Sequence, residues 1–206
     1  MKIGIYGGSF DPIHYGHLRP VRQAMDALAL DRVVYLPTAQ PPHKLGRAGA
    51  PAHARYAMVE LALLGEDGMF ASPLELTDRI AYTVETLEHF RREQPSARLF
   101  LIVGSDSLSC LDTWREWRKI LRLAELAVLA RPADPLREPS PALRSALDPS
   151  RVHRIENAPV AVSSTEVRRR IAAGSLNLHL LLPPLVLDYI YKYGLYQQDP
   201  SPDPRF

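Results

Sequence analysis

The sequence predicts an α/β protein built on a doubly wound (Rossmann-like) parallel sheet with a small helical C-terminal portion. Short strand-like runs alternate along the chain with segments of helical periodicity, which is the pattern of strands joined by crossover helices. Residues 99–103 and 126–130 are continuously apolar, as expected of central parallel strands that are buried on both faces. A glycine turn follows the first strand-like run, residues 3–6.

Each further element follows from its local pattern. After the first strand, Leu18, Val21, Met25 and Leu28 are spaced by three, four and three residues, so they share one face of a helix. Apolar runs predict the remaining strands at residues 33–36, 69–72, 99–103, 126–130 and 152–155. Apolar residues at helical spacing predict two more helices, over residues 52–64 and from Val84 to a point before Pro95.

One domain is expected to occupy residues 1–196, and its helical C-terminal part covers residues 164–196. Residues 197–206 contain three prolines and are expected to form a frayed tail. Residues 132–150 are rich in proline and charge, which predicts a surface connection in which Ser140 opens a short helix.

Composition narrows the class of protein. The formal net charge is only +2 and the arginines are spread along the chain, so we expect no nucleic-acid partner. The single cysteine excludes an internal disulfide bond. No signal-peptide pattern opens the chain, and prolines break the most apolar tract, residues 176–187. We therefore expect a cytoplasmic protein without a membrane partner.

Residues 7–17 read Gly-Gly-Ser-Phe-Asp-Pro-Ile-His-Tyr-Gly-His and form the most informative segment. Gly7 and Gly8 let the backbone approach a ligand closely, and the start of the next helix offers free N–H groups and a favourable dipole to an anion. His14 and His17 lie three residues apart, so both rings project to one side of the first helical turn, where they can stabilise phosphoryl oxygens. The alternative is a structural pair or half of a zinc site, but zinc needs further ligands at recognisable spacing and none is evident.

The segment Ser-Ser-Thr-Glu-Val-Arg at residues 163–168 is a second candidate for anion binding. Ser163 and Glu166 match a capping box, which predicts a helix start and is by itself a sufficient structural explanation. Three adjacent hydroxyls and Arg168 one turn further exceed what capping needs, and together they can form an anion cup at the positive end of the helix dipole.

The His-x-Gly-His element after Gly-Gly-Ser-Phe-Asp-Pro resembles the nucleotidyltransferase superfamily of adenylyl- and cytidylyltransferases, and the longer string resembles its nicotinate-nucleotide adenylyltransferase branch. Separated blocks from about residue 2 to about residue 196 carry this resemblance. Members transfer the adenylyl group of ATP to a phosphate monoester and release pyrophosphate; in this branch the acceptor is nicotinate mononucleotide, in NAD biosynthesis. The resemblance implies catalytic roles for His14, His17, Lys44 and Arg168. It implies ATP contacts for Gly7, Gly8, Ser9, Phe10, Asp106, Ser163, Ser164 and Thr165. It implies nicotinate-nucleotide contacts for Thr83, Trp114, Arg115 and Arg131.

Several of these residues have alternatives. Lys44 ends a proline-stiffened loop after a strand, where ligands bind in open α/β sheets, with Arg55 as a candidate assistant; a solvated lysine is the alternative. Asp106 follows a central strand and can accept hydrogen bonds from ribose hydroxyls, or it can cap the turn that follows. By resemblance Trp114 stacks on the pyridine ring and Trp117 packs, although tryptophans at this spacing are more often core residues.

The resemblance also implies Mg²⁺ as a cofactor that bridges phosphates. No carboxylate cluster is visible, so no protein ligand is assigned and the metal is expected on nucleotide oxygens and water. Ala81 stands where the resembled family usually has serine before Tyr-Thr, and Arg115 stands where many members have another aromatic residue. The degree of preference for the acid over the amide acceptor therefore stays open.

Rival functions are a phosphopantetheine or nicotinamide-mononucleotide adenylyltransferase and a non-catalytic nucleotide sensor. A dinucleotide-dependent dehydrogenase is excluded because the first turn lacks the Gly-x-Gly-x-x-Gly spacing. The expected partners are ATP and nicotinate mononucleotide, and a homo-oligomer is left open.

Overall fold

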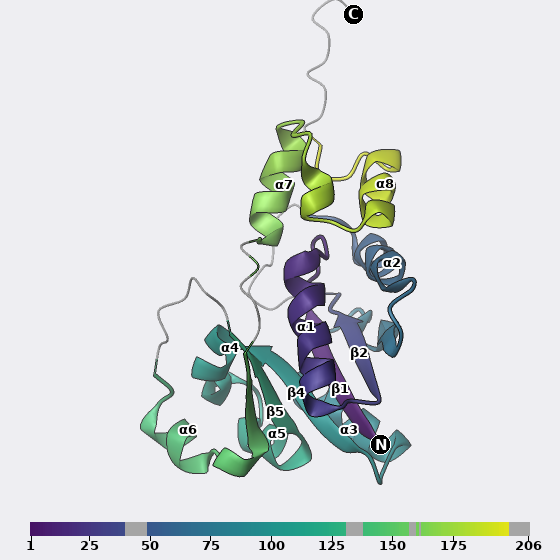
Figure 1. Ribbon diagram of the computed structural model, residues 1–206. Coiled ribbons are helices and arrows are strands. Elements are labelled where there is room, and N and C mark those ends of the chain that lie inside the picture. The colour runs from purple at the N-terminus through teal and green to yellow at the C-terminus, as the bar shows by residue number, and fades with distance from the viewer. Residues whose placement is uncertain (40–48, 131–137, 157–159, 161, 198–206) are drawn as a thin grey trace, which may run out of the picture.

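The computed structural model describes residues 1–39, 49–130, 138–156, 160 and 162–197. A six-stranded parallel sheet forms the centre of this part of the chain (Figure 1). Its strands are β1 (Lys2–Gly8), β2 (Arg32–Pro37), β3 (Met69–Ala71), β4 (Arg98–Gly104), β5 (Glu125–Leu129) and β6 (Val152–Ile155). They lie in the order β3-β2-β1-β4-β5-β6, which confirms the predicted doubly wound class.

Helices cover both faces of the sheet. They are α1 (Tyr15–Leu28), α2 (Ala52–Leu63), α3 (Thr83–Glu93), α4 (Ser105–Ser109), α5 (Trp117–Leu123), α6 (Pro141–Ala146), α7 (Ser164–Ala172) and α8 (Pro184–Lys192). Buried residues of α1, α2, α7 and α8 join one hydrophobic cluster, and those of α3, α4, α5 and α6 join the other. The predicted strands and helices are confirmed, including the short helix after Ser140, whose hydroxyl accepts from the Leu143 amide at 3.1 Å.

Strand β4 shows why the sheet needs two covers. Leu99, Leu101 and Val103 point into one cluster, while Phe100 and Ile102 point into the other, because successive side chains of a strand lie on opposite faces. A strand that is buried on both faces therefore reads as a continuous apolar run rather than as an alternation.

The sheet changes direction of winding between β1 and β4. From β1 the chain continues to β2 on one side, and from β4 it continues to β5 on the other. Ile5 is in register with Leu101, so Gly8 and Gly104, each three residues further on, end their strands at the same level. In open α/β sheets a ligand binds outside the carboxyl ends of the strands at such a switch point.

The C-terminal helices lie over the start of α1. In Figure 1, α7 stands above the N-terminal end of α1, and α8 lies beside α2. The Tyr15 amide, the first of α1, donates to the Leu181 carbonyl at 3.0 Å. The described residues include no helix that combines the length and the apolar character needed to cross a lipid bilayer.

Candidate functional site

The two motif histidines form a stacked pair at the start of α1. His14 is the N-cap residue and His17 lies one turn inside, with ring centroids 3.8 Å apart and planes inclined by 25°. The His14 amide donates to Nδ1 of His17 at 3.3 Å, and this contact favours the neutral tautomer that carries its proton on Nε2. His14 is only 4% exposed and His17 is half-buried, so His17 is the more accessible ring.

Neighbouring residues hold this pair in place. A Cβ at Gly16 would lie 2.9 Å from the His14 ring and 2.9 Å from Val162, so only glycine fits between the two histidines. Phe10 is buried and its ring meets His17 edge-on at 5.2 Å between centroids. Because the Phe10 side chain belongs to the core, the ATP contact predicted for this residue is open only to its main chain.

The glycine turn after β1 leaves its backbone accessible. Gly7 is exposed, and a Cβ built there would meet no atom within 4 Å. Gly8 instead sits against the Phe10 ring, which a Cβ would approach to 3.0 Å. The main chain at the carboxyl end of β1 is therefore open on one side and supported on the other, which suits close approach by a phosphate.

The second motif lies against the first, although about 150 residues separate them. The Ser164 hydroxyl donates to the Pro12 carbonyl at 3.0 Å, and Arg168 donates to the Asp11 carbonyl at 2.7 Å. Ser163 caps α7, with its hydroxyl accepting from the Glu166 amide at 3.2 Å. The start of α7 is thereby brought to the start of α1, so the two segments predicted to bind an anion lie side by side.

Only half of the predicted capping box is present. The Glu166 carboxylate pairs with the side chains of Arg169 and Arg170 at 2.8 and 2.6 Å. These two hydrogen-bonding arginines lower the pKa of Glu166 to about 2. Thr165 lies on the same turn, where its hydroxyl accepts from Arg168 at 3.4 Å.

Arg55 has a structural role that its sequence context did not indicate. It is 4% exposed, and its guanidinium donates to the main-chain carbonyls of Ser9, Thr38, Ala39 and Ala50. The loop after β1 and the loop after β2 are thus held by one side chain. Because its guanidinium donates to four main-chain oxygens, Arg55 acts as a clamp between loops, which differs from the role of assistant to Lys44 suggested above.

Asp106 lies at the carboxyl end of β4, across the switch point from the histidine pair. The alternative that it caps a following turn is wrong: α4 begins at Ser105 with Gly104 as its N-cap, so Asp106 is inside the first turn. Its main-chain carbonyl accepts from Ser109 at 2.6 Å. The position keeps Asp106 at the edge where a ribose would lie, and its predicted nucleotide contact stays a prediction.

Two of the residues predicted for the pyridine nucleotide, Thr83 and Arg115, lie at the start of α3. Thr83 is the first residue of α3, and Arg115 lies over the Tyr82 ring at 4.5 Å and pairs with Glu85 at 3.4 Å. Trp114 lies in the turn before α5, half-buried against the core. We call Tyr82, Thr83, Glu85 and residues 114–116 together the pyridine cluster.

Trp117 differs from Trp114 in its place and contacts. It is the first residue of α5, and Arg118 covers its ring at 4.1 Å. Both tryptophans pack against the same hydrophobic cluster. Two further predicted site residues, Lys44 and Arg131, lie outside the described residues.

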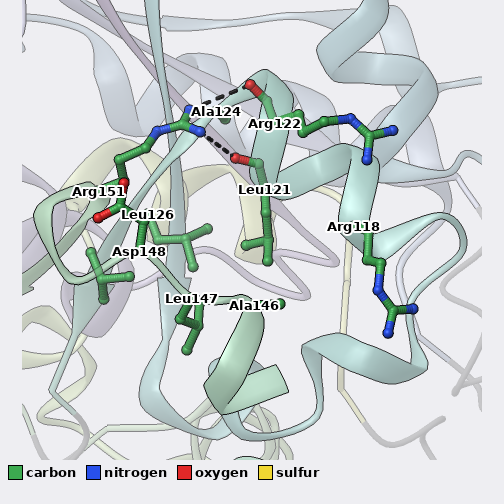
Figure 2. A pocket seen from close by; sticks show the side chains of 10 residues that line it. Arg118, Leu121, Arg122, Ala124, Leu126, Ala146, Leu147, Asp148 and Arg151 are labelled. Atoms are coloured by element: carbon green, nitrogen blue, oxygen red, sulfur yellow. Dashed lines mark hydrogen bonds between the residues drawn. The ribbon is translucent and has the colours of Figure 1, made fainter. Parts of the chain in front are cut away.

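A hollow of about 270 Å³ lies between α5, α6 and the start of β5 and β6 (Figure 2). Leu126 and Val152 place it at the amino edge of the sheet, opposite the histidines. Arg151, on its wall, donates to the Leu121 and Arg122 carbonyls at 2.7 and 3.4 Å. None of the predicted site residues lines it.

Two residues of the site carried no sequence signal of their role. The Asp11 carboxylate accepts from the Tyr196 hydroxyl at 2.6 Å and from the Ala50 amide at 3.0 Å. In the sequence, Asp11 is one residue of the first motif and Tyr196 is the last residue of the expected domain, and neither position indicates a contact between them. No periodicity or spacing could have paired positions that lie 185 residues apart.

A doubly wound sheet whose switch point carries stacked imidazoles, an open glycine turn and a serine–arginine helix start has the features of a nucleotide-binding protein. The cytidylyltransferase-like family model matches residues 5–170. A Neisseria gonorrhoeae protein named "Probable nicotinate-nucleotide adenylyltransferase" is 44% identical over 96% of this chain and 99% of its own length. A Thermus thermophilus protein of the same name is 42% identical over 96% of this chain and 100% of its own.

The chain therefore belongs to the cytidylyltransferase-like family and, within it, to the nicotinate-nucleotide adenylyltransferases. Its fold is shared with a solved structure titled "Plasmodium falciparum nicotinic acid mononucleotide adenylyltransferase complexed with NaAD". The TM-score is 0.77 at 21% sequence identity, and the match covers 95% of this chain and 97% of the other.

Proposed function

We propose that this protein transfers the adenylyl group of ATP to nicotinate mononucleotide, giving nicotinate adenine dinucleotide and pyrophosphate, as a step of NAD biosynthesis in the cytoplasm. The observation that carries the proposal is the meeting of the stacked His14–His17 pair with the start of α7 at the switch point. Full-length relatives that bear the name of this activity support it.

The reaction we propose is a direct in-line displacement. The 5′-phosphate of nicotinate mononucleotide attacks the α-phosphorus of ATP, the bond from that phosphorus to the bridging oxygen breaks, and pyrophosphate leaves. No protein nucleophile is needed, because the acceptor phosphate is itself the nucleophile. The work of the protein is to hold two anions together and to stabilise charge on the reacting phosphoryl group.

The residues divide this work by position. His17, with the proton of its neutral tautomer on Nε2, donates to the α-phosphate region, and His14 holds the ring of His17 by stacking and through its own amide. The main chain at Gly7 and Gly8 approaches the phosphates. Arg168 and the hydroxyls at the start of α7 face the β- and γ-phosphates.

The pyridine cluster is proposed to take the nicotinate ring. Trp114 supplies an aromatic face, and Thr83 offers the first N–H group and the hydroxyl of α3 to the carboxylate. Arg115 adds positive charge to that neighbourhood, although Glu85 already pairs with it. An acid-binding pocket of this kind discriminates against the amide because the amide leaves buried donors poorly matched.

Mg²⁺ is proposed as a cofactor carried by the phosphate oxygens of ATP. The carboxylate next to the glycine turn, Asp11, already accepts from Tyr196 and Ala50, so the donor set here fits a metal held by nucleotide and water rather than by protein. When bound, the metal would neutralise charge on the leaving pyrophosphate. No step of this proposal needs a nucleic acid, a membrane or a second copy of the chain.

Pyrophosphate release with a panel of acceptors tests the proposal. Nicotinate mononucleotide, nicotinamide mononucleotide and phosphopantetheine are compared at matched concentrations, with ATP and Mg²⁺ in excess. We expect the highest kcat/KM with nicotinate mononucleotide. If phosphopantetheine is used equally well, the branch is wrong, and if ATP binds in a calorimeter but no acceptor yields pyrophosphate, the protein is a sensor.

A further inference from the structure

We propose that Asp11 and Tyr196 act as a positioning pair for ATP binding. Tyr196, which follows α8, orients the Asp11 carboxylate. That carboxylate in turn holds the start of α7 and residues 49–50 against the loop that follows β1. Neither residue touches substrate. The inference deepens the proposed function, and it rests on that function for its kinetic readout.

The Asp11 carboxylate is the meeting point of three other chain segments. Its Oδ1 accepts from the Tyr196 hydroxyl at 2.6 Å and from the Ala50 amide at 3.0 Å. Its Oδ2 lies 3.7 Å from Nη1 of Arg168, and the same Nη1 donates to the Asp11 main-chain carbonyl at 2.7 Å. The carboxylate is only 15% exposed, so these contacts are poorly screened by water.

Gly49 shows independently that the position of this carboxylate is tightly defined. A Cβ on Gly49 would lie 2.3 Å from Oδ2 of Asp11, well inside any allowed contact. The main chain at residues 49–50 thus packs directly on the side chain that Tyr196 holds. Displacing the Asp11 carboxylate would release both residues 49–50 and Arg168 from their contacts with it.

The chain after α8 is shaped to deliver Tyr196. The Leu195 amide donates to the Ile190 carbonyl at 3.0 Å, and Gly194 has a φ of 63°, so the chain turns back at the end of the helix. Tyr196 itself has a φ of 62°, a conformation that residues other than glycine adopt at a cost. Leu195 and Tyr196 then pack against the core beside α7 and α8.

The phenol is suited to donate at every physiological pH. Burial and the hydrogen bond to Asp11 hold the pKa of Tyr196 far above its usual range, so the hydroxyl keeps its proton. The contact is therefore a charge-assisted hydrogen bond from a neutral donor to a carboxylate, the stronger kind. Because Oδ1 accepts from Tyr196 and Ala50 and Oδ2 faces Arg168, the Asp11 carboxylate serves to position Arg168.

The test uses Tyr196→Phe, which removes one hydroxyl, and Tyr193→Phe as the matched control. Tyr193 is 58% exposed, and its ring lies against Tyr189, at 4.6 Å between centroids, with the Lys192 ammonium 5.7 Å from its centre. We expect Tyr196→Phe to raise KM for ATP and the calorimetric Kd for ATP about tenfold, the effect of losing one charge-assisted hydrogen bond. The control should match the wild type in both.

Gly49→Ala gives a second route to the same result. The added methyl group displaces the Asp11 carboxylate while Tyr196 stays intact, so ATP affinity should fall in the same way. Assays are run well below the midpoint of thermal unfolding of each variant, and circular dichroism verifies that each is folded.

A purely structural role makes a different prediction. If Tyr196→Phe and Gly49→Ala lower only the unfolding temperature, while KM and Kd for ATP stay at wild-type values, the positioning role is overturned. The calorimetric measurement needs no acceptor. If the wild type binds ATP but forms no dinucleotide, the proposed function fails, and the ATP affinities of the variants still decide the positioning pair.

Discussion

The phosphate side and the pyridine side of the site are built in different ways. On the phosphate side, the buried Arg55 guanidinium and the Asp11 carboxylate, which is 15% exposed, bind main-chain atoms of several loops. In the pyridine cluster, Glu85 is partly buried, and it pairs with two exposed arginines, Arg115 of the cluster and Arg79 beside it. Exposed pairs of this kind contribute little rigidity. The part that we propose holds the reacting phosphates is therefore preorganised, whereas the part that we propose selects the acceptor is held mainly by exposed side-chain pairs.

The largest effect that would test this contrast is expected from His17→Ala on the phosphate side. Loss of a preorganised donor at the reacting phosphoryl group should lower kcat by about 100-fold or more. His179→Ala, at an exposed histidine of the C-terminal part, is the matched control and should keep wild-type turnover. Steady-state pyrophosphate release measures both, and near-normal turnover of the His17 variant would remove this ring from the chemistry.

Arg168→Met should come next. It deletes the guanidinium that links α7 to the Asp11 carbonyl, so KM for ATP should rise by about tenfold or more, with acceptor KM little changed. Arg169→Met is the control, because that guanidinium faces Glu166 on the solvent side of α7. Equal behaviour of the two variants would contradict a special role for Arg168.

A smaller and more selective effect is expected in the pyridine cluster. Trp114→Ala should raise KM for nicotinate mononucleotide about three- to tenfold through loss of an aromatic contact, while KM for ATP stays constant. Trp117→Ala should instead lower the thermal midpoint with little change in either KM. If Trp114→Ala raised the KM for ATP as well, the two sides of the site would be coupled. The contrast between a preorganised phosphate side and a separate pyridine side would then be wrong.

The smallest effect concerns the stability of the segment between the two sides. Burial raises the pKa of Glu75 above its ordinary value of 4.5, although the hydroxyl of Thr86 partly opposes this by donating to the carboxylate at 2.8 Å. The folded state therefore binds this proton more tightly than the unfolded state, so the associated stability is present below pH 4.5 and falls as pH rises through the folded-state pKa.

Glu75→Gln keeps an acceptor for Thr86 and cannot ionise. Relative to wild type, the variant should gain free energy of unfolding as pH rises from acid to neutral. Urea unfolding at several pH values measures this difference, and a difference that is independent of pH would show that Glu75 is not the group responsible.

Local signals predicted most of the fold. Ser140 and Ser163 mark helix starts because the serine hydroxyl accepts a hydrogen bond from the amide three residues later, at the start of the helix. This contact is local, so the sequence alone predicts it. The continuous apolar runs marked β4 and β5 because a doubly covered strand has no polar face. Where the local pattern was ambiguous, a prediction was wrong. Asp106 was a candidate cap, but α4 begins at Ser105 and Asp106 lies inside the helix.

Local signals could not predict contacts between segments that are distant in the sequence. The burial of His14 and the clamp made by Arg55 depend on which loops the folded sheet brings together. A histidine pair in the sequence indicates an anion site, but the sequence does not say which ring is the accessible one. The structure leaves His17 half-buried and covers His14 almost completely.

The amino-acid sequence by itself determined the class of sheet, the helix starts and the residue types that suit a polyphosphate, because periodicity, capping and glycine turns act over a few residues. Only the tertiary structure decided that α7 joins the first motif and that Tyr196 meets Asp11. Those contacts follow from how helices pack on the two faces of one sheet, and packing of segments more than 150 residues apart leaves no periodic trace in the chain.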